Sequence, residues 1–532
     1  MFILLLVVSL VSLIDATSVS SRSQSYPLSQ PAVTGPKTRM VIGNRLIAPD
    51  GFPRNASLVD GTFPGPLVTA QKGDHFDIEV VNMLKGDGMF EFTSVHWHGI
   101  FQNKTNYADG TANVTQCPIM PNHSFLYSFS AQNQTGTYWY HSHYSVQYCD
   151  GVRGPLVIYD PQDPYADMYD VDDASTVITL ADWYHGVSPG LRSQVTLAKS
   201  MLINGLGRSA QKPKADLAVI NVEQGKRYRF RLVQISCDAN VLFSIDGHNL
   251  TVIEADGQLT ESLVVDQLQI FAGQRYSVVL VADQPVNNYW VRSIPNSNGT
   301  YDGSAILRYK YAPEVEPTTV NTSCMNPLKE TDLHALINPG APGKPVYGDA
   351  DINLTLEVSF NASSFQWSVN NVPFKSPYDP ILSQILNETG DASQLQTNGS
   401  VYLIEANKVV ELTMKLGIAP GGPHPIHLHG HAFDVVQSAD SSTFNYANPV
   451  RRDVVSAGSD GQHTVIRWIT DNPGPWFIHC HIDWHLDEGF AVVMAESPQD
   501  TSRHINPVPE EWYNLCPIYH YYTEVEGGLD LY

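Results

Sequence analysis

Four pairs of histidines, each pair separated by a single residue, stand in this chain of 532 residues. They are His96 and His98, His141 and His143, His427 and His429, and His479 and His481. If the 19 histidines were placed at random, about 0.7 such pairs would be expected, so the excess needs a physical cause. On a β-strand, residues i and i+2 point to the same face, so each pair presents two imidazoles side by side. A cluster of metal ions is the simplest explanation of this pattern.

Cys480 stands between the two histidines of the fourth pair and therefore points to the opposite face of the same strand. We expect it to bind a different metal ion from the one that its neighbours bind. His424 and His485 lie close enough in the sequence to be its partners. One thiolate with two imidazoles is the ligand set of a blue-copper centre, whereas zinc usually takes four closed ligands or an activated water. The sequence therefore favours copper.

The first 14 residues form an apolar run that is too short to span a bilayer, and small polar residues follow it. This pattern is typical of a secretory signal, which we place at about residues 1–21; a buried N-terminal strand is the alternative. No other stretch of 18 apolar residues occurs, so we expect no membrane anchor. A net charge of −23 argues against binding to nucleic acid or anionic membranes. The chain is expected to be secreted and extracellular.

The sequons and the cysteines also indicate an extracellular protein. Twelve Asn-x-Ser/Thr sequons occur, and several are expected to be glycosylated: Asn55, Asn103, Asn113, Asn122, Asn133, Asn249, Asn298, Asn321, Asn353, Asn361, Asn387 and Asn398. Without Cys480, five cysteines remain, namely Cys117, Cys149, Cys237, Cys324 and Cys516. An oxidising compartment favours two disulfides and one free thiol, and the spacing alone leaves fifteen arrangements open.

A weak threefold repeat runs through the chain. Residues 73–80, 225–232 and 407–414 each show a turn followed by an alternation of apolar and polar residues, which predicts half-buried strands. Short strands, frequent turns and no long helical periodicity indicate antiparallel β-sandwiches. The segment that holds the first histidine pair is echoed at residues 244–248 and 425–429, but the middle copy has lost its pairs. We therefore expect the metals between the first and third repeats, with the middle repeat as a spacer and a wall of the substrate pocket.

These motifs resemble those of the multicopper oxidases over nearly the whole mature chain. The likeness is carried by residues 96–99, 141–143, 424–431 and 479–485, and residues 148–151 and 236–238 resemble the fungal laccases in particular. The resemblance implies an all-β chain of three consecutive cupredoxin-like Greek-key β-sandwich domains. We place them at residues 33–163, 164–332 and 333–532, with the type 1 copper in the third. The resemblance also implies four copper ions: one type 1, one type 2 and two type 3.

The ligands follow from the same resemblance. The type 1 copper would be held by His424, Cys480 and His485, and the type 2 copper by His96 and His427. The two type 3 ions would be held by His98, His141 and His481, and by His143, His429 and His479. Phe490 takes the axial position of the type 1 site and cannot donate, so the reduction potential is expected to be high. His431 is not a ligand in the family pattern.

Other roles are implied in the same way. The family disulfides correspond to Cys117 with Cys516 and Cys149 with Cys237, which leaves Cys324 without a partner. Asp238 would be the general base that takes the proton of a phenol. Asp109 and Asp483 would orient ligands or bring protons to the cluster.

The implied activity is that of a laccase, which oxidises its substrates by one electron at the type 1 copper. Phenols, aromatic amines or lignin fragments would give electrons through the edge of His485, and Cys480 would pass them to His479 and His481. Four transfers would reduce dioxygen to water, and the protein is expected to act as a monomer. Two alternatives stay open: a ferroxidase, which usually carries a membrane anchor, and a non-enzymatic copper-binding protein, which usually has many Met-rich sites.

Overall fold

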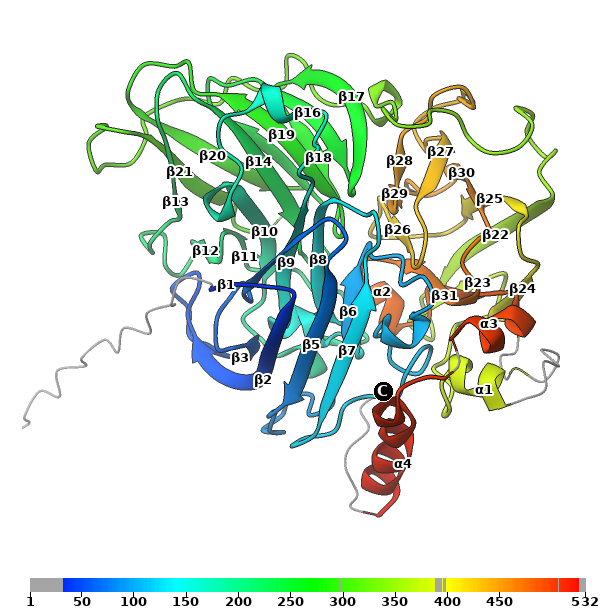
Figure 1. Cartoon of the computed structure of the whole chain (residues 1–532). Coiled ribbons are helices and arrows are strands. Elements are labelled where there is room, and N and C mark those ends of the chain that lie inside the picture. The colour runs from blue at the N-terminus through cyan, green and yellow to red at the C-terminus, as the bar shows by residue number, and fades with distance from the viewer. Residues whose placement is uncertain are drawn as a thin grey trace, which may run out of the picture.

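The computed structural model describes residues 32–238, 240–296, 299–387, 395, 399–505 and 507–525. The expected signal sequence, at residues 1–21, lies outside these residues, as do the sequon asparagines Asn298 and Asn398. The described chain forms six β-sheets, with two sheets in each successive third, and only short helices between them (Figure 1). This arrangement confirms the expected all-β fold. Within the described residues, no helix combines the length and the apolar character needed to cross a bilayer.

The first domain contains two sheets, drawn in blue to cyan in Figure 1, with the strand orders β1-β4-β9-β8-β6 and β3-β2-β5-β7. The strands are β1 Val33–Thr34, β2 Lys37–Ile47, β3 Arg54–Val59, β4 Leu67–Gln71, β5 His75–Asn82, β6 Val95–His98, β7 Ser124–Ser130, β8 Gly136–Ser142 and β9 Arg153–Tyr159. Two 3-10 turns, η1 Asn106–Ala108 and η2 Gln147–Asp150, lie in its loops.

The middle domain also contains two sheets, with the orders β12-β11-β10-β14-β19-β16-β17 and β13-β21-β20-β15-β18. Its strands are β10 Val177–Trp183, β11 Ser200–Ile203, β12 Leu206–Gly207, β13 Val219–Val222, β14 Arg227–Gln234, β15 Val241–Ile245, β16 Leu250–Ala255, β17 Gln258–Val265, β18 Leu268–Ile270, β19 Arg275–Val281, β20 Asn288–Pro295 and β21 Gly303–Tyr309. Short 3-10 turns precede, interrupt and follow them: η3 Ala166–Met168, η4 Ala174–Thr176, η5 Ser188–Leu191 and η6 Glu330–Asp332.

The third domain has the sheet orders β23-β22-β25-β30-β27-β28 and β24-β32-β31-β26-β29. Its strands are β22 Ile352–Asn361, β23 Gln366–Val369, β24 Val401–Ile404, β25 Val409–Leu416, β26 Pro425–Leu428, β27 Phe433–Gln437, β28 Arg451–Arg452, β29 Val454–Ser456, β30 His463–Ile469, β31 Gly474–Cys480 and β32 Ala491–Glu496. In the part of this domain that the structure describes, four α-helices accompany them: α1 Ile381–Asn387, α2 Asp483–Asp487, α3 Pro498–Ile505 and α4 Glu510–Val525.

The predicted repeat is confirmed at the level of individual strands. The three segments with alternating residues form β5, β14 and β25. Each lies between a parallel neighbour and an antiparallel one: β2 and β7 in the first domain, β10 and β19 in the middle one, and β22 and β30 in the third. The same sequence pattern therefore occupies the same place in each sandwich, but only β5 is half-buried as expected. Strands β14 and β25 are buried on both faces over most of their length, and on β14 the charges of Arg229 and Arg231 are paired with carboxylates.

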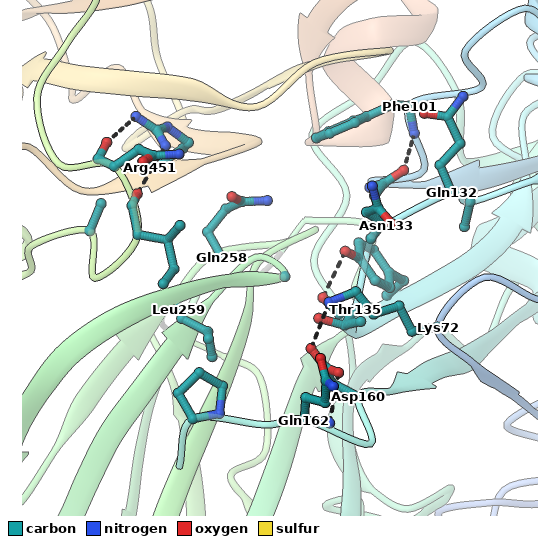
Figure 2. A pocket seen from close by; sticks show the side chains of 18 of the residues that line it. Lys72, Phe101, Gln132, Asn133, Thr135, Asp160, Gln162, Gln258, Leu259 and Arg451 are labelled. Atoms are coloured by element: carbon teal, nitrogen blue, oxygen red, sulfur yellow. Dashed lines mark hydrogen bonds and ion pairs between the residues drawn. The ribbon is translucent and has the colours of Figure 1, made fainter.

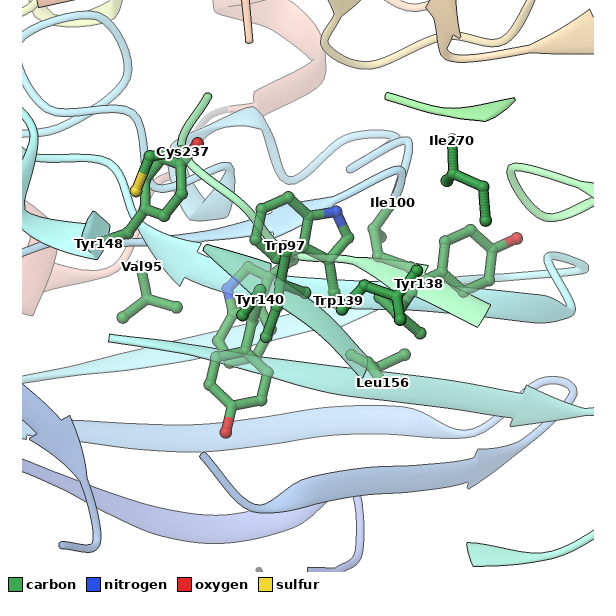
Figure 3. Packing of buried hydrophobic residues seen from close by; sticks show 14 of the residues in the cluster. Val95, Trp97, Ile100, Tyr138, Trp139, Tyr140, Tyr148, Leu156, Cys237 and Ile270 are labelled. Atoms are coloured by element: carbon green, nitrogen blue, oxygen red, sulfur yellow. The ribbon is translucent and has the colours of Figure 1, made fainter. Parts of the chain in front are cut away.

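Side chains along β6 point alternately toward the histidine cluster and into the core of the first domain. Trp97 lies between two of the paired histidines and is fully buried on the opposite side, where it contacts the rings of Tyr127, Phe129 and Tyr140. Figure 3 shows Trp97, Tyr138, Trp139 and Tyr140 packed among the strands of this domain. Buried aromatic rings of this size contribute strongly to stability and fix the strand that carries the histidines.

Two disulfides join distant parts of the chain and confirm the expected pairing. Cys117 is bonded to Cys516, which ties the first domain to α4, and Cys149 is bonded to Cys237, which ties the first domain to the middle one. Cys324 is free and exposed, while Cys480 is free and buried.

Candidate metal centre

The four histidine pairs meet where a sheet of the first domain faces a sheet of the third. Strands β6 and β8 are antiparallel neighbours, and their register places His96 opposite His141. Strands β26 and β31 are also antiparallel, with His427 opposite His479. Each pair starts on its strand, as predicted, although in three of the four pairs the second histidine lies just past the strand end. All eight imidazoles are buried at this junction.

Most of these imidazoles are held in place by a hydrogen bond from the ring nitrogen that points away from the cluster. Backbone carbonyl oxygens accept from Nδ1 in four of them: Asp109 O from His96 at 2.8 Å, Ser142 O from His141 at 2.8 Å, Asp453 O from His427 at 2.9 Å and Cys480 O from His479 at 2.9 Å. A carboxylate oxygen of Asp109 accepts from Nδ1 of His429 at 2.9 Å. These bonds place the proton on Nδ1 and the lone pair on Nε2, which is the form that binds metals.

The ring nitrogens that point into the cluster have no protein group that could take the place of a cation beside their lone pairs. Among the eight histidines of the cluster, Nε2 has no hydrogen-bond partner in four: His96, His141, His143 and His427. Nε2 of His429 lies 3.1 Å from Nε2 of His479, although both rings already donate through Nδ1. Two facing lone pairs repel each other unless a cation lies near them, and a buried polar atom without a partner costs about 1–3 kcal/mol. The residues therefore fit bound metal ions.

Burial keeps these imidazoles neutral. It lowers the pKa of six of them well below the ordinary value, assisted by the neighbouring rings: His98, His141, His143, His427, His429 and His481. Burial also lowers the pKa of His479 to about 3. Neutral imidazole is the metal-binding form, so the cluster is ready to accept cations without first losing protons.

The grouping of ligand atoms can be compared with the predicted sets. His143, His429 and His479 place one nitrogen each within 4.8 Å of the others, as the expected second type 3 set. The ligand atoms of the expected first set, His98, His141 and His481, do not all converge in this way, and those of His98 and His141 group with His96 instead. The ring centroids of the expected set are 5.0 to 5.8 Å apart, against 5.2 Å in the second set. The expected type 2 pair, His96 and His427, has ring centroids 5.7 Å apart.

Cys480 lies on the other face of β31, as its position in the sequence predicts. Its Sγ is 3.8 Å from Nδ1 of His424 and 3.7 Å from Nδ1 of His485. Nε2 of His424 donates to the carbonyl oxygen of Ala419 at 3.0 Å, so the lone pair of this ring faces the sulfur. Burial raises the pKa of the Cys480 thiol well above its ordinary value, and a thiolate here therefore needs a bound cation.

His485 is the one member of this trio that is partly exposed, whereas His424 and Cys480 are fully buried. Its ring lies 4.5 Å from the ring of Trp367. Phe490 is buried beside the trio, stacked on Trp367 at 5.1 Å and 5.7 Å from the ring of His424. A molecule at the surface would reach this site through the edge of His485.

The three predicted acids occupy different surroundings. Asp109 contacts two cluster histidines, through its carbonyl oxygen to His96 and its carboxylate to His429. Asp483 is buried against the disulfide, with Oδ2 3.5 Å from Sγ of Cys149. Asp238 is half-buried near the Cys480 site, and burial, with a smaller effect of Asp182, raises its pKa to about 7.

The middle domain contributes residues that the sequence did not reveal. Arg275 forms a two-pronged ion pair with Asp453, at 2.6 and 2.7 Å, and a carboxylate oxygen of Asp453 lies 3.3 Å from Nε2 of His98. Gly273 packs so tightly on the His481 ring that an added Cβ would come within 2.9 Å of it. The middle domain is therefore more than the spacer we expected. Neither residue belongs to a motif, so no sequence signal could have found them.

The likeness to known proteins extends over the whole site. Sequence profiles of the family described as multicopper oxidase match residues 42–163, 174–312 and 374–500. Laccase-5 of Trametes villosa is 55% identical over 91% of this chain and 94% of that protein, and the laccase of Phlebia radiata is 54% identical over 92% and 95%. The crystal structure of the laccase from Botrytis aclada matches with a TM-score of 0.79 and 31% identity over 93% of this chain and 94% of that one. The chain therefore belongs to the multicopper oxidase family, as a laccase that uses four copper ions.

Proposed function

We propose that this laccase is a secreted monomer that oxidises phenols and aromatic amines, including lignin fragments, with dioxygen as the electron acceptor. The observation that carries the proposal is the position of Cys480. Its sulfur lies with His424 and His485 on one face of β31, while the residues directly before and after it, His479 and His481, belong to the histidine cluster. Two kinds of site are thus joined through adjacent residues.

We assign the ligands as follows. The type 1 copper would be held by Cys480, His424 and His485, and the type 2 copper by His96 and His427. The two type 3 coppers would be held by His98, His141 and His481, and by His143, His429 and His479. When bound, the coppers supply one-electron oxidation at the thiolate site and reduction of dioxygen to water at the cluster.

The protein's own contribution is to fix the orientation and charge of these ligands. Asp109 holds His96 and His429 from behind, and Arg275 holds Asp453 against His98. Because most outer nitrogens are tied to the protein, the inner lone pairs keep their directions and little reorganisation is needed. Phe490 keeps a donor atom away from the thiolate site, which favours a high reduction potential.

Asp238 serves as the proton acceptor for phenols. A phenol that loses an electron becomes strongly acidic, so a carboxylate near the site of electron loss assists the reaction. A pKa of about 7 matches this role, because a base works best when its pKa lies near the working pH. Asp483, the buried first residue of α2, is assigned to proton delivery to the cluster.

Oxygen uptake measured together with substrate oxidation tests the proposal. We expect one dioxygen to be consumed for four phenols oxidised by one electron each, with an intense blue absorption band in the same sample. Oxidation of Fe(II) with no reaction of phenols would favour the ferroxidase alternative. Stoichiometric copper without oxygen uptake would favour a copper-binding protein and overturn the proposal.

A further inference from the structure

A large groove lies where all three domains meet, away from the thiolate site. Its volume is about 530 Å³, within the range of roughly 300–1,000 Å³ that is usual for small-molecule sites. The first domain contributes the turn between β7 and β8, the middle domain contributes Gln258 and Leu259, and the third domain contributes Arg451. Figure 2 shows Asn133 and Thr135 on one wall, with Gln258 and Leu259 across the opening.

The chemistry of the walls suits a carbohydrate. Amide side chains, including Gln132, Gln258 and Asn338, can both donate and accept hydrogen bonds. Phe101 adds an apolar ring on which one face of a sugar can rest. A sugar ring with hydroxyl and acetamido groups combines the same polar and apolar character.

Two sequons line this groove, and they differ in accessibility. Asn103, in Asn-Lys-Thr, is half-buried, and its Oδ1 accepts a hydrogen bond from Nε2 of Gln132 at 3.3 Å. Asn133, in Asn-Gln-Thr, is exposed in a tight turn that is closed by the bond from Gln134 N to Ala131 O. Asn133 is therefore the better acceptor for a glycan.

We propose that Asn133 carries an N-linked glycan whose first sugars lie in this groove and bridge the three domains. The inference rests on the proposed secretion, since the donor, a lipid-linked diphospho-oligosaccharide, is met in the secretory pathway. Nδ2 of Asn133 forms a bond to C1 of the first N-acetylglucosamine and loses one proton, while the bond from C1 to the diphosphate oxygen breaks.

Tethering makes even a weak contact effective. A group held on a short flexible link has an effective concentration on the order of millimolar, so a dissociation constant of about 0.1 mM for the groove is enough to keep the sugars there about nine-tenths of the time. A glycan bound only to the folded arrangement of the domains also stabilises that arrangement.

The test uses the enzyme secreted from a eukaryotic host, with Asn249 as the control. Asn249 is an exposed sequon between β15 and β16. Mass spectrometry of the glycopeptides gives the occupancy of each site, and timed treatment of the native protein with an endoglycosidase gives the rate of glycan removal. We expect Asn133 to be occupied and its glycan to be removed about tenfold more slowly than that of Asn249, which corresponds to about 1.4 kcal/mol of docking free energy.

Two variants separate docking from mere attachment. Gln258→Ala changes the opposite wall, so we expect faster removal at Asn133 with unchanged occupancy. Asn133→Gln should lower the melting temperature of the copper-loaded enzyme, and Asn249→Gln should not. If Asn249 is occupied and Asn133 is not, or if both glycans are removed at equal rates, the inference is wrong. If the full chain with its own N-terminal segment does not reach the medium of that host, the proposed secretion is wrong and the inference fails with it.

Discussion

Asp238→Asn is the most informative change at the site of substrate oxidation. Asparagine has nearly the same shape as aspartate but cannot accept the phenol proton. Burial raises the pKa of Asp238 to about 7, so its basic form is the minor one in acid. About one molecule in a hundred carries the carboxylate at pH 5, and about one in ten at pH 6. For the unaltered enzyme, kcat/KM for a phenol should therefore rise about tenfold between these two pH values.

The variant should lose this rise and much of the rate. A positioned base contributes about 10²- to 10⁴-fold, so we expect kcat/KM for a phenol at pH 7 to fall by at least about a hundredfold. Ferrocyanide gives up an electron without a proton and serves as the control substrate, for which the fall should be small. The assay is initial oxygen uptake with each donor from pH 4 to 8. Equal slowing of the phenol and ferrocyanide would refute the role of Asp238 as a base.

Three further changes test other parts of the site. Phe490→Met adds a donor that stabilises Cu(II), so a redox titration of the blue band should give a lower potential, and an unchanged or higher value contradicts this. Arg275→Met leaves the buried carboxylate of Asp453 without its ion-pair partner and should lower the free energy of unfolding by about 3–5 kcal/mol in a denaturant titration. A loss under about 1 kcal/mol would contradict a stabilising role of this ion pair. Gly273→Ala strains a positive φ of 86° and presses on His481, so copper per protein should fall; Gly225→Ala, at φ 87° with open space around it, should keep its copper.

Much of the site could be predicted because its ligands lie close together in the sequence, within single strands. A pair of histidines two residues apart needs only a strand to present both rings to one side, and Cys480 needs only the same alternation to face the other way. The repeated strands β5, β14 and β25 could be predicted for the same reason. Each pattern is carried by the alternation of residues within one short segment.

The rest depends on contacts between residues far apart in the chain. Arg275 and Asp453 are separated by 178 residues, and their ion pair exists only because the middle and third domains meet at the cluster. Gly273 shows its importance only through the ring of His481 that packs on it. The groove beside Asn133 likewise has walls from all three domains. Periodicity and motifs describe single segments and carry no information about such junctions.

The copper content and visible spectrum of Cys480→Ser test the central claim most directly, because the claim is that this sulfur holds one copper and connects it to the other three. The account predicts that the variant loses about one of four coppers, the whole blue band and phenol turnover, while the histidine cluster keeps its metals. A variant that retains the blue colour and oxidises phenols at the original rate would contradict it.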